Sequence, residues 1–328
     1  MQNFRAYRIF NEIGKVHSRL VETTLNELDA GEVVLKAAYS SVNYKDALAT
    51  TGVGKVIRRF PCIGGIDVSG VVTSSTDSRF KEGDEVIVTS YDLGVSHDGG
   101  YSEYVRVPAA WVVPLPKGLT LFDAMAIGTA GYTAALAIHI MEQNDLKPVN
   151  GKVAVTGATG GVASIGIDML VKLGYYVVAI TGKDGEHDYL KKLGAAEVLS
   201  RHTLEMGTRP LEKALWAGAL DSVGGEQLAW LIRTMQQNGV IGSFGNVGGV
   251  ELHTTVLPFI LRGVRLLGVD SANTAMPLRR AIWARLATDL HPQHLAEITH
   301  IVSLDQLPGV FEKMLQSQSR GHTVIKLY

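Results

Sequence analysis

The chain has 328 residues, enough for two domains of ordinary size, and its 46% hydrophobic and 19% charged residues are typical of a globular protein. A formal net charge of −1 gives no global attraction to nucleic acid, and the single cysteine, Cys62, excludes an internal disulfide and a cysteine-rich zinc site. The first ten residues carry charges and lack the apolar core of a secretory signal, so we expect a cytoplasmic location.

The first 120 residues read mostly as short strands separated by turns. Gly-Asp at 83–84 and Gly-Gly at 99–100 interrupt the patterns, as turn residues do. We therefore expect a β-rich, barrel-like domain. β-branched or alternating residues predict its strands at 5–10, 32–40, 70–74, 85–88 and 102–108.

The pattern changes to helical at about Leu121, and residues 122–141 predict one long helix. The weakly polar run 124–141 inside it is dominated by Ala and Gly and is marginal for spanning a bilayer. We interpret it as a buried helix at a domain junction, and we expect no membrane partner.

Strands alternate with helical patterns in the second half of the chain. Six strands joined by right-handed crossovers make a doubly wound parallel sheet, so we expect an α/β Rossmann domain over 125–296. The tail, with a helix near 277–289, a strand near 298–302, a helix near 304–316 and a strand near 323–327, is expected to rejoin the first domain, giving 1–124 and 297–328. The six strands are predicted at 153–155, 177–181, 197–201, 219–223, 240–244 and 265–269.

A glycine-rich turn, 157–163, lies between a buried strand and a helical pattern, and a second strand follows at 176–180. In this strand-turn-helix setting, glycines let the backbone approach a pyrophosphate, and the helix N-terminus offers free N–H groups to it. The glycines at 157, 160 and 161, with Ala163 after them, do not match GxGxxG literally. Dinucleotide binding is the favoured interpretation, and an ordinary structural turn is the alternative.

The end of the second strand indicates which dinucleotide binds. NAD sites place a carboxylate there for the ribose hydroxyls, but this strand ends in Thr181, Gly182 and Lys183, and Asp184 lies beyond the tip. Arg201 closes the next strand, where its guanidinium could contact a 2′-phosphate. We therefore favour NADP over NAD, while solvated strand-end charges remain the alternative.

Short-chain dehydrogenases also carry a TG-rich turn, but they place it at the chain start and need a Tyr followed four residues later by Lys. None of the eleven tyrosines here is followed in that way. That class therefore fits poorly.

The whole chain instead resembles the medium-chain dehydrogenase/reductase superfamily, which implies a GroES-like β-rich catalytic domain followed by the Rossmann domain. Its zinc-containing members carry a Cys and a His-Glu pair where this sequence has Asn43–Asp46 and Ile66-Asp67. The resemblance therefore implies the zinc-free, quinone oxidoreductase-like branch. The motifs that carry it lie at 41–46, 64–70, 83–86, 99–104, 128–134 and in the glycine-rich turn.

Within that branch the chain looks closest to the acryloyl-CoA reductase (NADPH) family, through the motifs at 41–48, 91–94, 159–162 and 268–271. This resemblance implies NADPH-dependent reduction of a small 2-enoyl-CoA, most directly acryloyl-CoA to propionyl-CoA, and a homodimer. The family tends to have Arg before its last strand, whereas this chain reads Arg320-Gly321-His322.

The candidate catalytic residues are Tyr44, Asn43 and Asp46. Tyr44 is the first candidate at the nicotinamide, as a positioning group or proton donor, with a packed aromatic side chain as the alternative. Asn43 and Asp46 are expected to orient the loop, and Asp67 either holds a turn or has a direct role. Other cofactor-binding candidates are Thr159, Gly160, Gly161, Val162, Thr181, Gly182, Lys183 and Arg201, with Asn246, Ile260 and Ser271 at later strand ends; Asn246 could equally be a turn residue.

Two further groups remain open. Lys55, Arg58 and Arg59 could receive coenzyme A phosphates or form a solvated face, whereas His291 and His294 lack an evident third metal ligand. Besides enoyl-CoA reduction, the same fold could serve an NADPH:quinone oxidoreductase or a non-enzymatic NADPH-binding protein.

Overall fold

A computed structural model describes residues 3–328, and its contacts divide them into two compact units. Unit 1 comprises the chain up to Ala130 together with Ala272–Ala287 and Thr299–Tyr328, and unit 2 comprises Gly131–Ser271 and Thr288–Ile298. The predicted boundaries assigned 272–287 to the nucleotide-binding domain, whereas the contacts place this segment in unit 1.

Arg279 explains why that segment belongs to unit 1. Its side chain is fully buried, and its guanidinium donates to the Thr89 carbonyl (3.1 Å), the Thr89 hydroxyl (2.9 Å) and the Tyr91 hydroxyl (3.1 Å). A buried guanidinium needs such partners, and they come from strand β6 (Glu85–Thr89) and the residues after it. Helix α7 (Met276–Leu286), which carries Arg279, is thereby fastened to this unit.

Unit 1 is built on two sheets. One has the order β2-β1-β4, and the other has the order β15-β16-β3-β5-β6-β8 with β7 also paired to β3. Strand β16 pairs antiparallel with β3, so the C-terminal tail lies in the same sheet as strands from the first hundred residues. This matches the predicted β-rich, barrel-like domain. The strands are β1 Phe4–Glu12, β2 Lys15–Thr23, β3 Val33–Val42, β4 Cys62–Ile63, β5 Asp67–Ser75, β6 Glu85–Thr89, β7 Tyr104–Val107, β8 Val113–Pro114, β15 Thr299–Val302 and β16 His322–Lys326.

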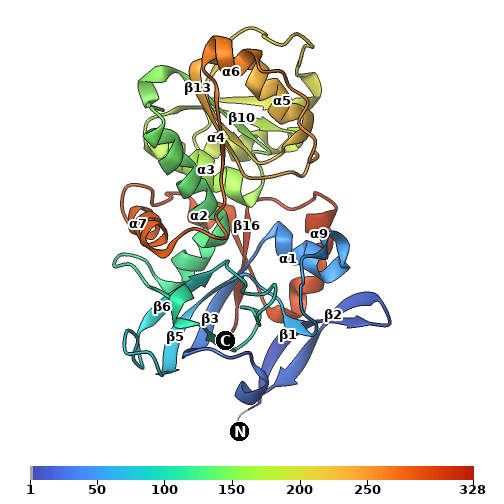
Figure 1. Cartoon of the computed structure of the whole chain (residues 1–328), viewed down its shortest axis with the longest axis vertical. Helices are drawn as coiled ribbons and strands as arrows, with labels where there is room; N and C mark the ends of the chain where they lie inside the picture. Colours follow the sequence, from blue (N-terminus) through green and yellow to red (C-terminus); the bar gives the residue numbers. More distant parts are fainter. Residues whose placement is uncertain (1–2) are drawn as a thin grey trace. The chain divides into compact units, whose positions relative to one another are not determined.

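A helix stands where the sequence analysis expected a loop. Helix α1 (Tyr44–Thr51) begins directly after Asn43 and ends at Gly52, whose φ of 73° is left-handed. It packs beside α9 (Leu307–Leu315), as Figure 1 shows. The candidate residues Tyr44 and Asp46 therefore have fixed positions in its first turn.

The long apolar helix α2 (Leu121–Gln143) was predicted as a buried helix. It is long and apolar enough to cross a membrane by length and composition alone, but 83% of its most apolar window is buried, as in the core helix of a globular protein. Gly128 interrupts it with φ 52° and ψ −160°, which are not helical values. This break frees backbone groups that would otherwise bond within the helix.

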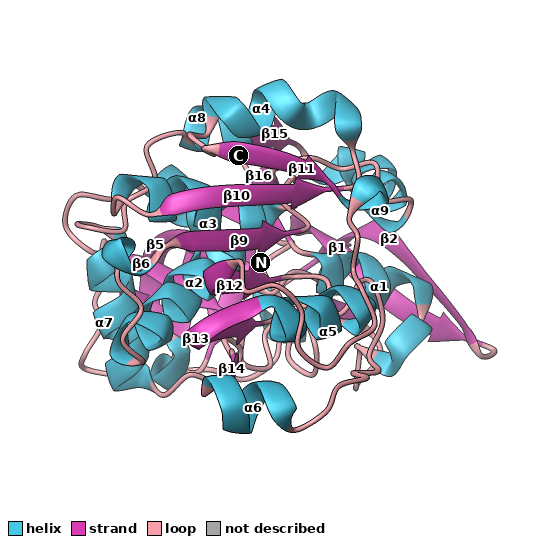
Figure 2. Ribbon diagram, turned by 90° about the horizontal axis from the view of Figure 1, so that it is seen from above, coloured by secondary structure: helices cyan, strands magenta, loops and turns pink. Residues whose placement is uncertain are grey.

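Unit 2 contains the predicted doubly wound sheet, with six parallel strands in the order β11-β10-β9-β12-β13-β14 (Figure 2). The chain runs outward from β9 to β11 and then returns to β12 beside β9, so the strand order reverses between β9 and β12. Ligands of such sheets bind outside the carboxyl ends of the strands at this point. The strands are β9 Lys152–Thr156, β10 Tyr176–Thr181, β11 Glu197–Ser200, β12 Trp216–Asp221, β13 Met235–Ser243 and β14 Arg265–Gly268; the helices are α3 Gly161–Lys172, α4 His187–Lys192, α5 Gly225–Thr234, α6 Leu257–Arg262 and α8 Leu295–Ile298.

Candidate active site

The Asp67 carboxylate is the centre of a buried polar network in unit 1. Asp67 is fully buried at the start of β5 and accepts four hydrogen bonds. The donors are the Ser41 hydroxyl (2.6 Å), the Asn43 amide (2.8 Å), the Thr129 backbone N–H (2.9 Å) and the Thr129 hydroxyl (2.5 Å). Because these donors come from two separate parts of the chain, residues 41–43 and Thr129, the carboxylate fixes them relative to one another. We call this set the Asp67 network.

The break in α2 makes the Asp67 network possible. At Gly128 a Cβ atom would lie 2.7 Å from Ser41 Oγ, 2.9 Å from His322 Cε1 and 3.1 Å from Asp67 Oδ2, so only glycine fits. The non-helical backbone there leaves the next N–H, that of Thr129, to donate to Asp67. The sequence analysis did not identify Gly128 or Thr129 as site residues.

His322 borders the same network. Its ring is buried, and its Nδ1–H donates to the Ala126 carbonyl (2.9 Å), because a carbonyl oxygen can only accept. Burial lowers the pKa of His322, and the neighbouring Asp67 charge only partly opposes this effect. This histidine stands where the resemblance leads one to expect Arg.

Asn43 and Asp46 set the start of α1. The Asn43 backbone N–H donates to Asp46 Oδ2 (2.8 Å), and the Ile66 N–H donates to Asp46 Oδ1 (3.1 Å). Burial raises the pKa of Asp46 to about 7, with a further contribution from the Asp67 charge. These hydrogen bonds hold the backbone at the start of α1, a helix where the sequence analysis expected a loop.

Tyr44 is the exposed member of this group. It is the first residue of α1, and 40% of its surface is exposed, so a buried, packed aromatic does not describe it. Tyr44 directly follows Asn43, whose side-chain amide donates to Asp67, so one residue connects Tyr44 to the Asp67 network.

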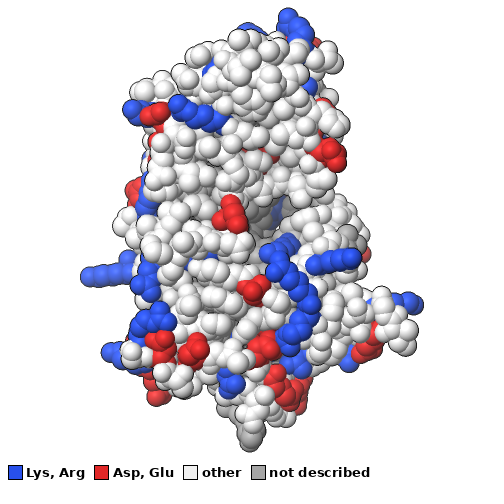
Figure 3. Space-filling view, in the orientation of Figure 1, with Lys and Arg blue, Asp and Glu red and all other residues white. Residues whose placement is uncertain are grey.

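The predicted basic cluster at 55–59 is largely paired with acids. Arg58 lies 3.5 Å from Asp92, and the Arg59 guanidinium binds Asp29 and lies 3.8 Å from Asp98. Acidic and basic side chains are also interspersed on the face of the molecule in Figure 3. The cluster therefore presents less free positive charge than the sequence indicates.

In unit 2 the glycine-rich turn follows β9 as predicted. Gly157, the first residue of the turn, has a φ of 60°. A Cβ atom at this position would clash with the Ser222 hydroxyl. The Ala158 N–H donates to the Ile180 carbonyl (3.1 Å), and Gly160 is the N-cap of α3. The first N–H groups of α3, from Gly161 onward, have no acceptor within the helix and are available to an anion.

Asp221 fixes the point where the strand order reverses. It is buried at the end of β12, and it accepts from the Thr156 hydroxyl (2.8 Å), the Ser243 hydroxyl (3.2 Å) and the Gly224 N–H (3.1 Å). Burial raises its pKa, and these hydrogen bonds oppose the rise. The sequence analysis missed Asp221, although a carboxylate directly after an apolar strand and before Gly224 and Gly225 was a visible signal.

The ends of β10 and β11 bring together the residues predicted to contact a 2′-phosphate. Thr181 pairs with Ser200 in the parallel register, so the residues that follow each strand emerge side by side. The Thr181 hydroxyl accepts from the Lys183 N–H (3.0 Å), and the Arg201 side chain packs against Gly182. His202, which the sequence analysis did not name, lies 3.1 Å from the Gly182 carbonyl.

The later strand ends agree only in part with the prediction. Ser271 follows β14 and accepts from the Thr133 hydroxyl (2.8 Å), and Asn246 is exposed after β13. Ile260 is not at a strand end: it lies inside α6, 69% exposed, ahead of the amino end of β14. It therefore lies in a helix and not at a strand end, where the sequence pattern had placed it.

These features fit a dinucleotide phosphate in unit 2. The N-terminus of α3 suits a pyrophosphate. No carboxylate occupies the tip of β10, and within the described residues Arg201 forms no ion pair, so its guanidinium can meet an anion. The dinucleotide phosphate would be held by Thr159, by Val162 and by the residues at the ends of β10 and β11.

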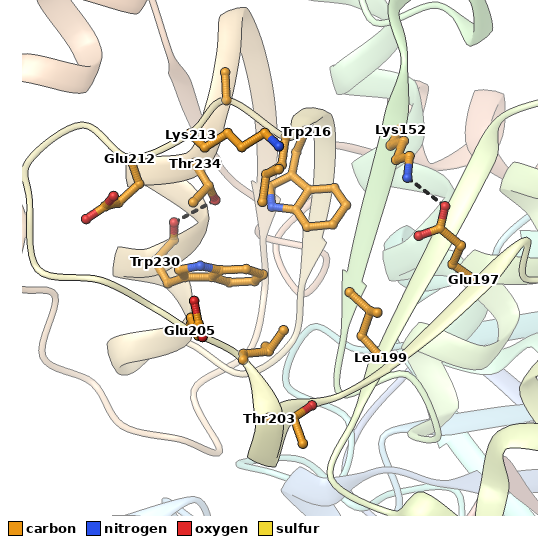
Figure 4. Close-up of a pocket in the computed structure, with 13 residues that line it drawn as sticks. Lys152, Glu197, Leu199, Thr203, Glu205, Glu212, Lys213, Trp216, Trp230 and Thr234 are labelled. Carbon is orange, nitrogen blue, oxygen red and sulfur yellow. Dashed lines mark hydrogen bonds and ion pairs between the residues drawn. The ribbon is translucent and has the colours of Figure 1, made fainter.

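A cavity of about 620 Å³ in unit 2 lies elsewhere (Figure 4). It is lined by Trp216, at the start of β12, and by Trp230, whose ring stands edge-on 5.9 Å away. Its rim carries the Lys152–Glu197 ion pair (2.6 Å). Since β12 begins here, the cavity opens at the amino edge of the sheet and contains none of the predicted cofactor residues.

Of the two histidines that lack an evident third metal ligand in the sequence, His291 and His294, the second has a structural role in unit 2. His294 donates from its backbone N–H (2.8 Å) and its Nδ1 (2.9 Å) to the buried carboxylate of Asp168. Across residues 3–328 there is no group of three His, Cys, Asp or Glu side chains placed to hold a metal ion.

Two family models match this chain, and the second also extends through residues 272–287 of unit 1. Residues 29–117 match the family described as alcohol dehydrogenase GroES-like domain, and residues 161–287 match the family described as zinc-binding dehydrogenase. The first match lies in the β-rich unit 1, and the second covers α3 and the strands that follow it.

Two relatives are similar over nearly their whole length. The Bacillus subtilis (strain 168) protein YhfP, which bears a provisional quinone oxidoreductase name, is 51% identical over 95% of this chain and 94% of its own. Its crystal structure, solved with NAD bound, has a TM-score of 0.97 and covers all of both chains. The acrylyl-CoA reductase AcuI of Ruegeria pomeroyi is 42% identical over 96% of each chain.

A solved structure with the other cofactor is equally similar. The yhdH oxidoreductase of Salmonella enterica, in complex with NADP, is 44% identical, has a TM-score of 0.96, and covers 99% of this chain and 100% of its own. With the fold, the motifs and these relatives in agreement, the chain belongs to the zinc-free, quinone oxidoreductase-like branch of the medium-chain dehydrogenase/reductase superfamily, in one family with YhfP and AcuI.

Proposed function

We propose that the protein is an NADPH-dependent reductase of the C=C bond of a small 2-enoyl-CoA, with acryloyl-CoA as its first candidate substrate and propionyl-CoA as the product. The substrate class rests on the relative AcuI, whose name describes an acrylyl-CoA reductase. Unit 1 then acts as the catalytic domain and unit 2 as the nucleotide-binding domain.

The observation that carries the choice of NADPH is the cationic end of β10 and β11. Lys183 and Arg201 follow these strands, and the β10 tip lacks the carboxylate that would hold the ribose hydroxyls of NAD. A guanidinium and an ammonium favour a 2′-phosphate. The relatives have been solved with either cofactor, so this local charge is the reason for the choice.

We assign the remaining cofactor contacts from their places in the fold. We assign the pyrophosphate to Gly160, Gly161 and Val162 at the start of α3, and the nicotinamide half to Asn246 and Ser271. Ile260 is omitted because it lies in α6.

When bound, NADPH supplies the hydride that adds to the β-carbon of the enoyl thioester. Negative charge then develops on the carbonyl oxygen and the α-carbon, which must receive a proton. We assign Tyr44 as the donor or positioning group, since its side chain is exposed at the start of α1. The Asp67 network holds Asn43, and Asp46 holds the first turn, so Tyr44 starts from a fixed backbone.

Reduction of a quinone by NADPH is the second candidate. It is favoured by the pairing of Arg58 and Arg59 with Asp92 and Asp29, because these arginines are then less available to coenzyme A phosphates. The relative YhfP, whose name describes a quinone oxidoreductase, also favours this candidate. Of the three residues in the basic cluster, exposed Lys55 is then the one that remains for a coenzyme A phosphate.

We also propose a homodimer formed through the edge of the unit 2 sheet. Among the described residues β14 pairs only with β13, so its outer edge is open. The segment before β14 exposes large apolar side chains, which normally mark an interface. These are Val247, Val250, Val256, Ile260 and Leu261. Sedimentation velocity tests this proposal. We expect the parent protein to be a dimer and the Ile260→Glu variant to be a monomer. If the variant is a dimer like the parent protein, the proposed interface is contradicted.

The loss of NADPH absorbance on mixing with acryloyl-CoA tests the main proposal. We expect fast turnover with NADPH, slow turnover with NADH, and little with a simple benzoquinone. Turnover with benzoquinone alone would replace the proposal by the quinone reductase, and NADPH binding without turnover of either substrate would indicate a non-enzymatic binding protein.

A further inference from the structure

His202 lies where two neighbouring strands of unit 2 end together. The last residues of β10 and β11, Thr181 and Ser200, are partners in the parallel register. The chain after β11 forms the short turn Arg201–Thr203, and the His202 N–H donates to the Ser200 hydroxyl (3.3 Å). This turn brings His202 to the end of β10.

Gly182 is contacted by both residues of this turn. A Cβ atom on Gly182 would lie 2.8 Å from the Arg201 guanidinium carbon, so that side chain covers the Gly182 Cα closely. The His202 ring reaches the Gly182 carbonyl through Nε2 (3.1 Å). The guanidinium and the imidazole therefore border the same short piece of backbone.

The hydrogen bond to Gly182 fixes the role of each ring nitrogen. A carbonyl oxygen only accepts, so Nε2 of His202 carries the proton and donates. In the neutral ring, Nδ1 is then an acceptor, which repels an anionic oxygen. In the protonated ring, Nδ1 becomes a second donor, and the contact with Gly182 is kept.

We propose that His202 is a specificity-determining residue for the 2′-phosphate of NADPH, contacting it beside Lys183 and Arg201 in the protonated form, so that affinity for this cofactor depends on pH. The proposal rests on the proposed function and adds a residue and a mode of regulation to that site. NADH lacks the 2′-phosphate, so the affinity for NADH should not depend on pH in this way.

The other charged groups at this place are a lysine and several carboxylates. Lys183, Asp184 and Glu186 follow β10, and Glu205 lies beyond the turn that contains Arg201. The first turn of α3, residues 161–164, has no charged side chain. An imidazole is the side chain that changes charge between pH 5 and 8, and a phosphate monoester has its second ionisation near 6.

The two titrations predict a binding curve with a maximum. A phosphate monoester carries its second charge above about pH 6, and an imidazole carries its proton toward the acid end of the range between pH 5 and 8, so affinity should be highest between these two limits. Because the site is exposed, we expect the affinity to fall by about threefold to fivefold between pH 6.5 and 8.0.

Calorimetric titration of the full chain with adenosine 2′,5′-bisphosphate tests the proposal, with 5′-AMP as the ligand that lacks the 2′-phosphate. The variants are His202→Asn, whose amide can still donate to Gly182 but does not titrate, Lys183→Ala within the same site, and His300→Asn at an exposed histidine of β15. Far-ultraviolet circular dichroism checks that each variant is folded.

We expect the Kd of the bisphosphate to rise between pH 6.5 and 8.0 in the parent chain and in His300→Asn, and to stay level in His202→Asn. Equal pH dependence in His202→Asn and the parent chain, with weaker binding in Lys183→Ala, would overturn the role of His202 and leave the NADPH proposal standing. Equal affinity of the parent chain for the bisphosphate and 5′-AMP at every pH would overturn both.

Discussion

The two candidate regions hold their charged side chains in opposite ways. In unit 1 the Asp67 carboxylate is fully buried, and four donors occupy it. In unit 2 the basic side chains that follow β11, Arg201 and His202, are exposed at the carboxyl edge of a sheet. The first arrangement is closed and the second is open to a ligand.

The two arrangements have different roles in the protein. A buried carboxylate that satisfies donors from several segments contributes to stability and geometry, because losing it leaves those donors unpaired. Exposed cations contribute little to stability but can meet an incoming anion. Substitutions in unit 1 should therefore affect folding and turnover, and substitutions at the strand ends of unit 2 should affect cofactor affinity alone.

The largest effect is expected from removing the centre of the buried network. Asp67→Ala leaves donors from Ser41, Asn43 and Thr129 unsatisfied, and the free energy of unfolding should fall by about 3 kcal/mol or more in urea titrations. Lys183→Ala is the control and should change it by less than about 0.5 kcal/mol. Similar losses in both variants would remove the contrast between the regions.

Tyr44→Phe sharpens the comparison within unit 1, since Tyr44 is exposed beside the buried network. If its hydroxyl takes part in proton transfer, kcat should fall by at least about tenfold while the Kd of NADPH stays constant. Tyr328→Phe, at an exposed tyrosine near the end of the chain, is the matched control. An unchanged kcat would exclude Tyr44 from the chemistry.

Lys183→Ala should raise KM for NADPH by about tenfold and leave KM for NADH nearly unchanged, because only NADPH presents a 2′-phosphate. Steady-state kinetics with both cofactors measures this ratio. Equal increases for the two cofactors would contradict the assignment of the 2′-phosphate to this edge of unit 2.

A pH dependence of stability is expected from Asp46. Its pKa is raised by burial from 3.8 to about 7 in the folded chain, so the folded state binds the proton more tightly than the unfolded state. Asp46 should therefore lower stability progressively as pH rises from about 4 to 7, and have no further effect above it. We expect the slope of Tm against pH in this window to be less negative in Asp46→Asn; an unchanged slope would contradict the burial of this charge.

Much of the fold could be predicted from local sequence patterns. The six strands of unit 2 are short apolar runs separated by helical patterns, and the order of domains follows from where each pattern occurs. Helix α1 was missed, although Asn43 followed three residues later by Asp46 is a start signal for a helix. Ile260 was misplaced because the six residues of α6 are too few to show a helical period.

The Asp67 network could not be predicted in this way. Its members Ser41, Asp67 and Thr129 are separated by 26 and 62 residues, and only the antiparallel pairing of strands and the break at Gly128 bring them together. His202 was missed for a related reason, since its importance comes from the register of β10 with β11. Such sites depend on tertiary contacts that a single sequence does not reveal.

The most direct test of the central claim is the position of deuterium in the product after reduction of acryloyl-CoA with NADPH deuterated at the transferable position. We predict one deuterium at C3 of propionyl-CoA by mass spectrometry, and one at C2 when unlabelled NADPH is used in deuterium oxide. Propionyl-CoA without label at C3, or no propionyl-CoA at all while the cofactor binds, would contradict the assignment of the protein as an NADPH-dependent enoyl-CoA reductase.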